Sequence, residues 1–169
     1  MRRLAVLVSI ASLVLLIPSS ASAGKPVKEP LPLPPVIELP GVCPDFGIVA
    51  DILVNREYAK TWFDASGDPV STITNGTLKV RLTEPDSGTS IVRNISGPGT
   101  TIFHADGSST LTARGTWFFF FFPGDLGPGS EPMSFVNTGT IVIHTAPNGI
   151  QSIRSRTGKV EDVCATLGG

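Results

Sequence analysis

Apolar and polar residues alternate with a period of two through most of the chain, a pattern that is typical of β-strands. In the segment Gly76–Thr83, Leu78, Val80 and Leu82 lie on one face, and polar residues lie between them on the other. No segment after the N-terminal region shows a convincing helical period. The same alternation predicts strands at 46–54, 57–63, 70–74, 89–95, 100–105, 109–121, 134–145, 150–156 and 159–164.

Turn residues separate these strands. Asn75-Gly76, Asp106-Gly107 and Asn148-Gly149 favour the positive φ angles of tight hairpins. Because short connections make successive strands antiparallel neighbours, the sequence predicts an antiparallel meander of about eight strands. Closure into a small β-barrel would remove the free edges, and a two-sheet sandwich is the alternative. We therefore expect a single all-β domain over residues 41–169.

The run Trp117–Phe122 contains five of the nine phenylalanines. Alternation places Trp117, Phe119 and Phe121 on one face of the strand and the other three rings on the opposite face. Both faces are therefore apolar, and we expect the first three side chains to point inward. An aromatic-lined pocket or an exposed contact patch is the functional interpretation of this run.

A strand with two apolar faces needs two covers, since large rings left in water promote association. We expect Phe118 and Phe120 to be covered by leader residues 31–39, by the loop 123–132 or by a second subunit. This loop is rich in Pro and Gly and follows the aromatic run directly, so it is well placed to form a rim or lid.

The predicted strand at residues 109–121 is unusually long. At about 3.3 Å per residue it would extend about 43 Å, roughly twice an ordinary strand. It must therefore bend, and Gly115 is the residue that permits a bend or a bulge because it lacks a Cβ.

The N-terminus has the pattern of a secretory signal peptide. Arg2 and Arg3 precede an apolar stretch, residues 4–17, and the small residues Ala21-Ser22-Ala23 follow. The apolar stretch is shorter than the roughly 20 residues that cross a bilayer as a helix. We expect removal of residues 1–23, a mature chain that begins at Gly24, secretion, and no membrane span after cleavage.

Residues 24–40 form a leader with six prolines in seventeen positions. Proline cannot donate helix or sheet hydrogen bonds, so we expect the leader to be extended and mostly unstructured, acting as a spacer. A recognition peptide is the first alternative. In the second alternative, apolar residues of the leader such as Leu33 and Ile37 pack onto the domain.

Charge and cysteine content narrow the classes of protein further. The chain has 13 Lys and Arg against 14 Asp and Glu, and removal of Arg2 and Arg3 leaves a net charge of about −3 without a concentrated basic face. This excludes nucleic acid as a partner. Cys43 and Cys164 are the only cysteines, and in an oxidising compartment we expect them to form one disulfide.

The sequence lacks the usual motifs for nucleophilic, zinc, phosphate-loop or dinucleotide chemistry. His104 and His144 are the only histidines. His104 with Asp106 and Ser108 suggests a hydrolytic triad, but Asp106 precedes a turn glycine, which explains it by local backbone bonding. A metal site would need both histidines on neighbouring strands plus a carboxylate. We expect no catalytic residue, no metal and no cofactor.

The part of the chain from about residue 75 to 165 contains a recognisable set of segments: Gly76–Val80, Asn94–Gly99, the Asp106-Gly107 hairpin with its following strand, the aromatic run, Phe122–Leu126 and the cysteine near the C-terminus. Together they resemble small secreted actinobacterial proteins of unknown function. The resemblance implies secretion and a common β-rich domain. It implies no functional residue.

The sequence thus predicts a secreted, non-catalytic β-barrel module. We expect it to bind through its aromatic strand end. The expected binding partner is an apolar small molecule, a protein or envelope component, or a second copy of the chain. The candidate ligand-binding residues are Trp117, Phe119, Phe121, His104 and His144. The alternatives are a small secreted hydrolase or barrel isomerase that uses His104 or His144, and a purely structural envelope protein.

Overall fold

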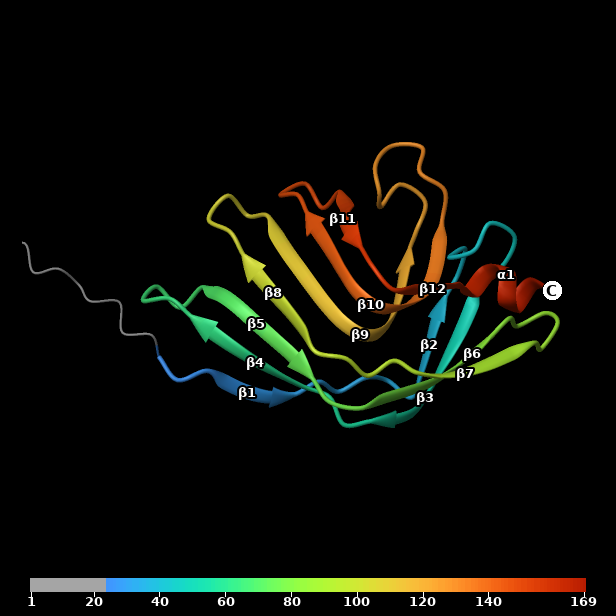
Figure 1. The fold of residues 1–169 in the computed structure, drawn as a ribbon, viewed down its shortest axis with the longest axis horizontal. Coiled ribbons are helices and arrows are strands. Elements are labelled where there is room, and N and C mark those ends of the chain that lie inside the picture. Colours follow the sequence, from blue (N-terminus) through green and yellow to red (C-terminus); the bar gives the residue numbers. More distant parts are fainter. Residues whose placement is uncertain (1–23) are drawn as a thin grey trace, which may run out of the picture.

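A computed structural model describes residues 24–169, and the predicted signal peptide lies outside this range. Every strand expected from the alternation is present, with ends within two residues of the predicted ones. The elements are β1 (Val27–Pro30), β2 (Val36–Leu39), β3 (Ile48–Asn55), β4 (Tyr58–Phe63), β5 (Pro69–Asn75), β6 (Leu78–Thr83), β7 (Ser90–Asn94), β8 (Gly99–Phe103), β9 (Ser109–Phe121), β10 (Met133–Thr145), β11 (Gln151–Arg156), β12 (Lys159–Asp162) and α1 (Val163–Gly168) (Figure 1).

The strands form two antiparallel sheets. The large sheet has the order β1-β4-β5-β8-β9-β10-β11, with β12 also paired to β10, and the small sheet has the order β2-β3-β6-β7. The expectation of an all-β, antiparallel fold is confirmed. The expectation of a simple meander of about eight strands is wrong, because β1 pairs with β4, β3 with β6 and β5 with β8, so several neighbours in the sheets are not consecutive in the chain. The expectation of a closed barrel is wrong, because the hydrogen-bonded ladders of residues 24–169 end at free edges in both sheets. Two sheets agree with the sandwich alternative.

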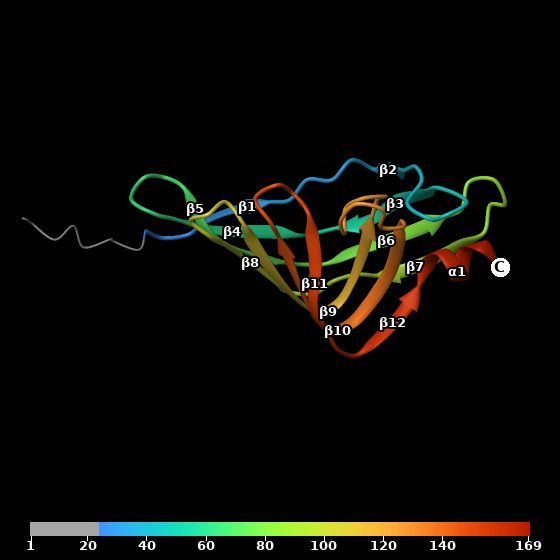
Figure 2. The ribbon, with the colours of Figure 1, turned by 90° about the horizontal axis from the view of Figure 1, so that it is seen from above.

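The barrel does not form because one broad sheet divides into two layers. On one side of the division, three strands of the large sheet are joined to strands of the small sheet by short links. Residues 56–57 join β3 to β4, residues 76–77 join β5 to β6, and residues 95–98 join β7 to β8. On the other side β9 and β10 curve away, and β11 continues into β12 after residues 157–158. Figures 1 and 2 show the two sets of strands diverging from a common origin.

We use three names for the resulting regions. The wing is the undivided part of the large sheet, made of β1, β4, β5, β8, β11 and the adjoining halves of β9 (109–115) and β10 (139–145). The small sheet is β2-β3-β6-β7. The aromatic layer consists of residues 116–121 of β9, residues 133–138 of β10, and β12.

Glycines lie where the long strands bend. Gly115 of β9 is paired with Gly139 of β10, and both have positive φ angles, +84° and +154°. A Cβ on Gly139 would lie 2.2 Å from the carbonyl oxygen of Thr157. The register between β9 and β10 is continuous through this pair. Gly115 thus has the backbone conformation that permits the expected bend, and no bulge occurs between these two strands.

The core has two apolar clusters, one on each face of the aromatic strand. The first lies between the small sheet and the aromatic layer, where Phe118 and Val136 pack against residues such as Leu78 and Val80. The second lies on the opposite face of β9 and β10 and extends from the aromatic layer into the wing. It contains Ala113, Phe119, Phe121, Phe135, Ile141 and Ile143, with Leu126 of the 122–132 loop packed against them.

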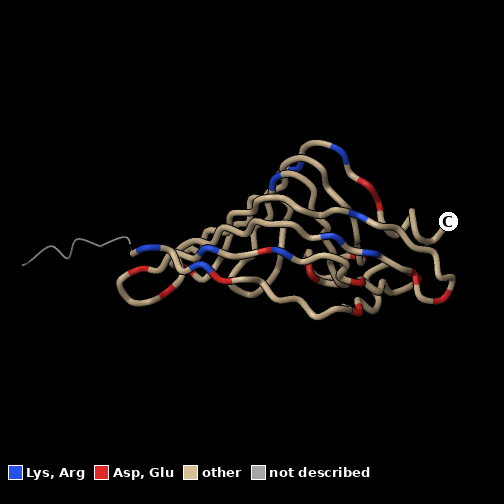
Figure 3. The backbone as a smooth tube through the Cα atoms, turned by 90° about the horizontal axis from the view of Figure 1, so that it is seen from below, with Lys and Arg blue, Asp and Glu red and all other residues tan. Residues whose placement is uncertain are grey.

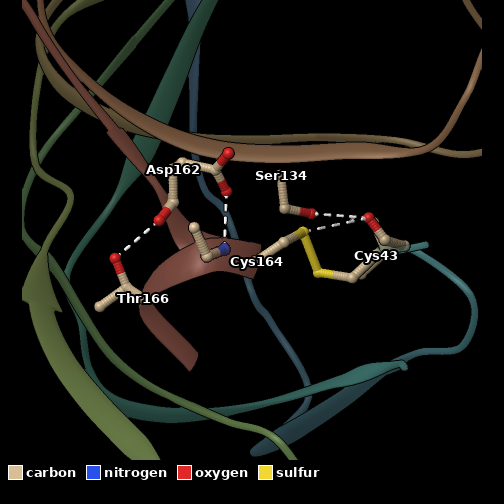
Figure 4. Close-up of a disulfide and its surroundings, with 7 residues drawn as sticks. Cys43, Ser134, Asp162, Cys164 and Thr166 are labelled. Carbon is tan, nitrogen blue, oxygen red and sulfur yellow. Dashed lines mark hydrogen bonds between the residues drawn. A yellow bond between two sulfur atoms is a disulfide. The ribbon is translucent and has the colours of Figure 1, made fainter. Parts of the chain in front are cut away.

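Cys43 and Cys164 form the expected disulfide, with Cα atoms 5.6 Å apart. Figure 4 shows the bridge between the β2–β3 connection and α1, beside Ser134, whose hydroxyl donates to the Val42 carbonyl at 3.1 Å. The chain turns into α1 because Asp162 accepts a hydrogen bond from the backbone amide of the third helical residue, so the strand ends at 162 rather than at 164. The bridge therefore closes one end of the sandwich and does not join two barrel strands.

The leader forms part of both sheets. β1 pairs with β4, and β2 pairs with β3. Between these strands the Leu31 amide donates to the Glu57 carbonyl at 3.0 Å. The expectation that most of the leader is unstructured is wrong, and its packing onto the domain was the better interpretation. Both strands are edge strands, where proline is tolerated because one side of the strand has no partner.

Candidate functional site

A cavity of about 300 Å³ lies between the small sheet and the aromatic layer, near the point where they diverge. Its wall is apolar apart from one carboxylate. The leader contributes Leu33, Ile37 and Leu39, the last two from β2. The other strands of the small sheet and the residue that follows β7 contribute Ala50, Ile52, Leu78, Val80 and Ile95. The aromatic layer contributes Trp117, Phe118 and Phe120, and Glu57 completes the lining.

The sheet edges determine which side of the sandwich holds this cavity. The small sheet ends at β2 and β7, and the aromatic layer ends at β9 and β12. Arg93 of β7 forms a two-pronged ion pair with Glu161 of β12, with Nε 2.9 Å from Oε2, and this pair joins one side. On the opposite side, Ile37 of β2 and Phe118 of β9 pack against the same apolar cluster, and Phe120 is 39 % exposed.

Local hydrogen bonds position Glu57. It lies in the two-residue link between β3 and β4, where its backbone amide donates to Asn55 Oδ1 at 3.0 Å. Its carbonyl oxygen holds the leader through Leu31. Partial burial raises the pKa of the Glu57 carboxyl above its ordinary value. Within residues 24–169 this carboxylate has neither a hydrogen-bond donor nor an ion-pair partner.

Glu57 also borders a second, more open depression of about 450 Å³ under the leader. Most residues that line this groove are polar or charged, and we call it the polar groove. The lining residues are Lys28, Glu29, Pro30, Leu31, Pro32, Asn55, Arg56, Glu57 and Tyr58. The Nζ of Lys28 lies 4.1 Å from the centre of the Tyr58 ring, so a cation–π contact engages this ammonium group. Glu57 therefore stands at the junction of an apolar cavity and a polar groove.

The structure separates the candidate aromatic residues. Trp117 lines the cavity, and its indole Nε1 donates to the Arg114 carbonyl at 3.1 Å. Phe119 and Phe121 lie in the second cluster, 8 % and 1 % exposed, and do not line the cavity. The opposite face of the strand contributes Phe118 and Phe120 instead.

The cover expected over these two rings is present only in part. Leader residues Ile37 and Leu39 belong to the same apolar cluster as Phe118. Phe120 remains 39 % exposed. Its ring forms an edge contact with that of Phe122, with centroids 5.8 Å apart.

His104 and His144 meet on the wing, away from the cavity. The Nε2 of His104 lies 2.9 Å from Thr110 Oγ1, and the Nδ1 of His144 lies 3.4 Å from the same oxygen. Asp106 accepts a hydrogen bond from the Ser108 amide at 2.9 Å, and hydrogen bonding with Ser108 lowers the pKa of this carboxyl. Asp106 thus stabilises its own hairpin. No group of three metal-ligating side chains occurs in the described range.

Basic and acidic residues are interspersed along the backbone in Figure 3. No helix in this part of the chain is long and apolar enough to cross a membrane.

Sequence reasoning missed several residues of this site. No motif in the sequence singles out Glu57, because its place beside apolar side chains depends on the leader, whose residues pack around the same cavity. Leu33 and Ile37 were noted only as one alternative for the leader. The apolar residues that remain between prolines were the available signal for that alternative.

No protein-family model, curated protein or solved structure matches this chain. Homology therefore assigns no ligand and no chemistry to the cavity. The geometry and the chemical nature of its lining are the basis for a functional assignment.

Proposed function

We propose that this protein is an exported, non-catalytic binding module that holds an apolar small molecule in the cavity between the leader and the aromatic layer. The observation that carries this proposal is the cavity wall, which is apolar except for Glu57. Ligand pockets are typically apolar clefts of about 300–1,000 Å³ with a few convergent polar groups. The volume of about 300 Å³ is at the lower end of this range.

The expected affinity is modest. A ligand that removes about 150 Å² of apolar surface from water gains about 4 kcal/mol before it pays the entropy of association. Three aromatic side chains of the aromatic layer add specific ring contacts. Because a net gain of about 4 kcal/mol corresponds to a dissociation constant of about 1 mM, we expect dissociation constants in the high micromolar to millimolar range for single-ring ligands.

Export is part of the proposal. The pattern of residues 1–23 is that of a signal peptide, and the Cys43–Cys164 bridge is compatible with an oxidising compartment. Mass spectrometry of culture supernatant should detect a mature chain that begins at Gly24. Detection of residues 1–20 on the extracellular protein would contradict this.

A cavity-filling substitution tests the binding proposal. Ala50 is 4 % exposed and lines the cavity, so Ala50→Leu should weaken binding of the neutral fluorescent probe N-phenyl-1-naphthylamine at least fivefold. Ala59→Leu, on β4 of the wing, adds the same volume elsewhere and should leave the affinity unchanged. Equal probe binding by both variants and the unmodified protein would refute the cavity as the site.

Self-association through the wing is a second candidate. Phe63 of β4 and Phe103 of β8 lie on the same face of the sheet by alternation and are each 39 % exposed. The strands β4, β5 and β8 make their main contacts with neighbouring strands. A second copy would cover such side chains. Light scattering should then show a concentration-dependent dimer that Phe103→Lys abolishes, whereas a monomer at every concentration would rule this candidate out.

A further inference from the structure

Glu57 is the single ionisable residue in the lining of the apolar cavity. Every other lining side chain among the described residues is aliphatic or aromatic. A ligand with its apolar body in the cavity would therefore contact one charged side chain, that of Glu57. Glu57 lines both the cavity and the polar groove, so a ligand head group at Glu57 would lie at the boundary between them.

The carboxylate of Glu57 has no donor from the described part of the chain, although its backbone amide and carbonyl are both engaged. Burying a charged group without a partner costs free energy. A ligand that donates a hydrogen bond, or that carries a positive charge, would remove part of this cost. A ligand carboxylate would increase it by repulsion between like charges.

The other charged groups of the groove do not neutralise Glu57. Lys28 lies over the Tyr58 ring, and neither Lys28 nor Arg56 forms an ion pair with Glu57 within residues 24–169. Glu29 is the second acid of the groove, but it does not line the cavity. Glu57 is thus the charge nearest to a ligand in the apolar cavity.

We infer that Glu57 makes the cavity selective for apolar molecules with a hydrogen-bond-donating head group, with amines preferred over alcohols and carboxylates rejected. This inference rests on the proposed function and names the ligand class of the same site. The apolar body lies between the small sheet and the aromatic layer, and the head group lies at Glu57 with its free side toward the groove. Burial also raises the pKa of this carboxyl, so the preference for amines decreases as the pH falls and Glu57 becomes protonated.

Three ligands with one apolar body test the inference: 4-phenylbutylamine, 4-phenylbutan-1-ol and 4-phenylbutanoate. Isothermal titration calorimetry of the mature chain at pH 7.5 should rank them amine, alcohol, carboxylate, with at least a tenfold difference between the first and the last. In Glu57→Gln the charge is lost while the shape is kept, so this difference should fall to less than threefold. Glu29→Gln removes a charge from the same groove and should preserve the ranking.

The outcomes separate the inference from the proposal beneath it. Equal affinities of the three ligands for the unmodified protein would overturn the role of Glu57 and leave an apolar binding module. Absence of binding by all three, together with failure of the neutral probe, would overturn both. If Glu57→Gln and Glu29→Gln reduced the ratio of amine to carboxylate affinity equally, the preference would come from the overall negative charge of the groove, and the inference would be overturned.

Discussion

Two single residues occupy unusual local environments, and both are informative. Glu57 puts an ionisable group beside an apolar cavity, where partial burial raises its pKa. Gly139 has a φ angle of +154° at a point where a Cβ would lie 2.2 Å from a backbone oxygen. The first feature suggests a function that needs a carboxylate, and the second shows where the backbone has no room for a side chain.

Glu57→Gln should stabilise the protein at neutral pH in the absence of ligand. The pKa of Glu57 is higher in the folded state than in the unfolded state. Between these two pKa values the folded state holds a proton that the unfolded state has lost, so the free energy of unfolding falls as the pH rises through this range. The amide carries no charge and avoids the penalty. Differential scanning calorimetry should show a higher Tm for the variant at pH 7.5 and a smaller difference at pH 4. A lower Tm at pH 7.5 would mean that the carboxylate has a stabilising partner.

Gly139→Ala should destabilise the fold strongly. Its methyl group meets the Thr157 oxygen at 2.2 Å, so we expect a loss of about 3 kcal/mol or more in the free energy of unfolding. Gly149→Ala is the matched control, because Gly149 also has a positive φ, +86°, but open space around the added methyl. Its cost should be about 1–2 kcal/mol. Urea denaturation measures both, and equal losses would show that the bend tolerates a side chain.

Two features at the level of elements shape the cavity: the leader on one side and the pair of β7 and β12 on the other. The leader supplies Leu33, Ile37 and Leu39 to the cavity wall. Arg93 and Glu161 connect two edge strands that are not joined by ladder hydrogen bonds. The sandwich is thus closed by side chains along one edge and by the leader along the other.

Removal of the leader should open the cavity. A chain that begins at Gly41 lacks β1, β2 and three lining residues, so it should have a lower Tm and bind more 8-anilinonaphthalene-1-sulfonate than the chain that begins at Gly24. A chain that begins at Pro34 keeps β2 with Ile37 and Leu39, and should behave between the two. Equal dye binding and stability of all three chains would show that the leader is not a structural cover.

Glu161→Gln should weaken the β7–β12 contact. The hydrogen bond from Arg93 lowers the pKa of the Glu161 carboxyl, so the pair stabilises the fold above the unfolded pKa of this group and loses its effect as the pH falls through the lower folded value. We expect a loss of about 0.5–1 kcal/mol at pH 7. Thermal unfolding at pH 7 and pH 3 measures it. Glu38→Gln, at an exposed position of β2, is the control, and an equal change in both variants would exclude a specific contribution from the pair.

At the scale of the whole molecule, one sheet divides into two layers that are held together at several places. The common wing joins the layers at one end, and the Cys43–Cys164 bridge with α1 joins them at the other. Val42, Cys43, Val163 and Leu167 are each at most 1 % exposed at this second end. The disulfide therefore restrains the separation of the layers as well as the unfolded chain.

Replacement of both cysteines by serine should lower stability without changing the fold. A bridge across 121 residues restricts the unfolded chain by about 4–5 kcal/mol in the loop-entropy treatment, which is an upper value. The Tm should therefore fall by several degrees while the far-ultraviolet circular dichroism of the strands is retained. An unchanged Tm would show that the sandwich closes without the bridge.

The sequence by itself determined the local structure of this protein. Period-two alternation and glycine-containing turns place the strands because these signals depend on neighbouring residues alone. With only two cysteines, the disulfide has one possible pairing. The need for a bend at Gly115 follows from the length of the aromatic strand.

Only the tertiary structure decided where the sheet divides and which residues meet in the cavity. Barrel and sandwich share the same hairpins, so local turns do not distinguish them. The aromatic strand is apolar on both faces, and alternation therefore does not tell which face meets the cavity; the fold turns Phe118 and Phe120 toward it and buries Phe119 and Phe121 behind. Glu57 becomes part of a site because the leader pairs with β3 and β4, and contacts between distant segments of this kind leave no periodic pattern in the chain.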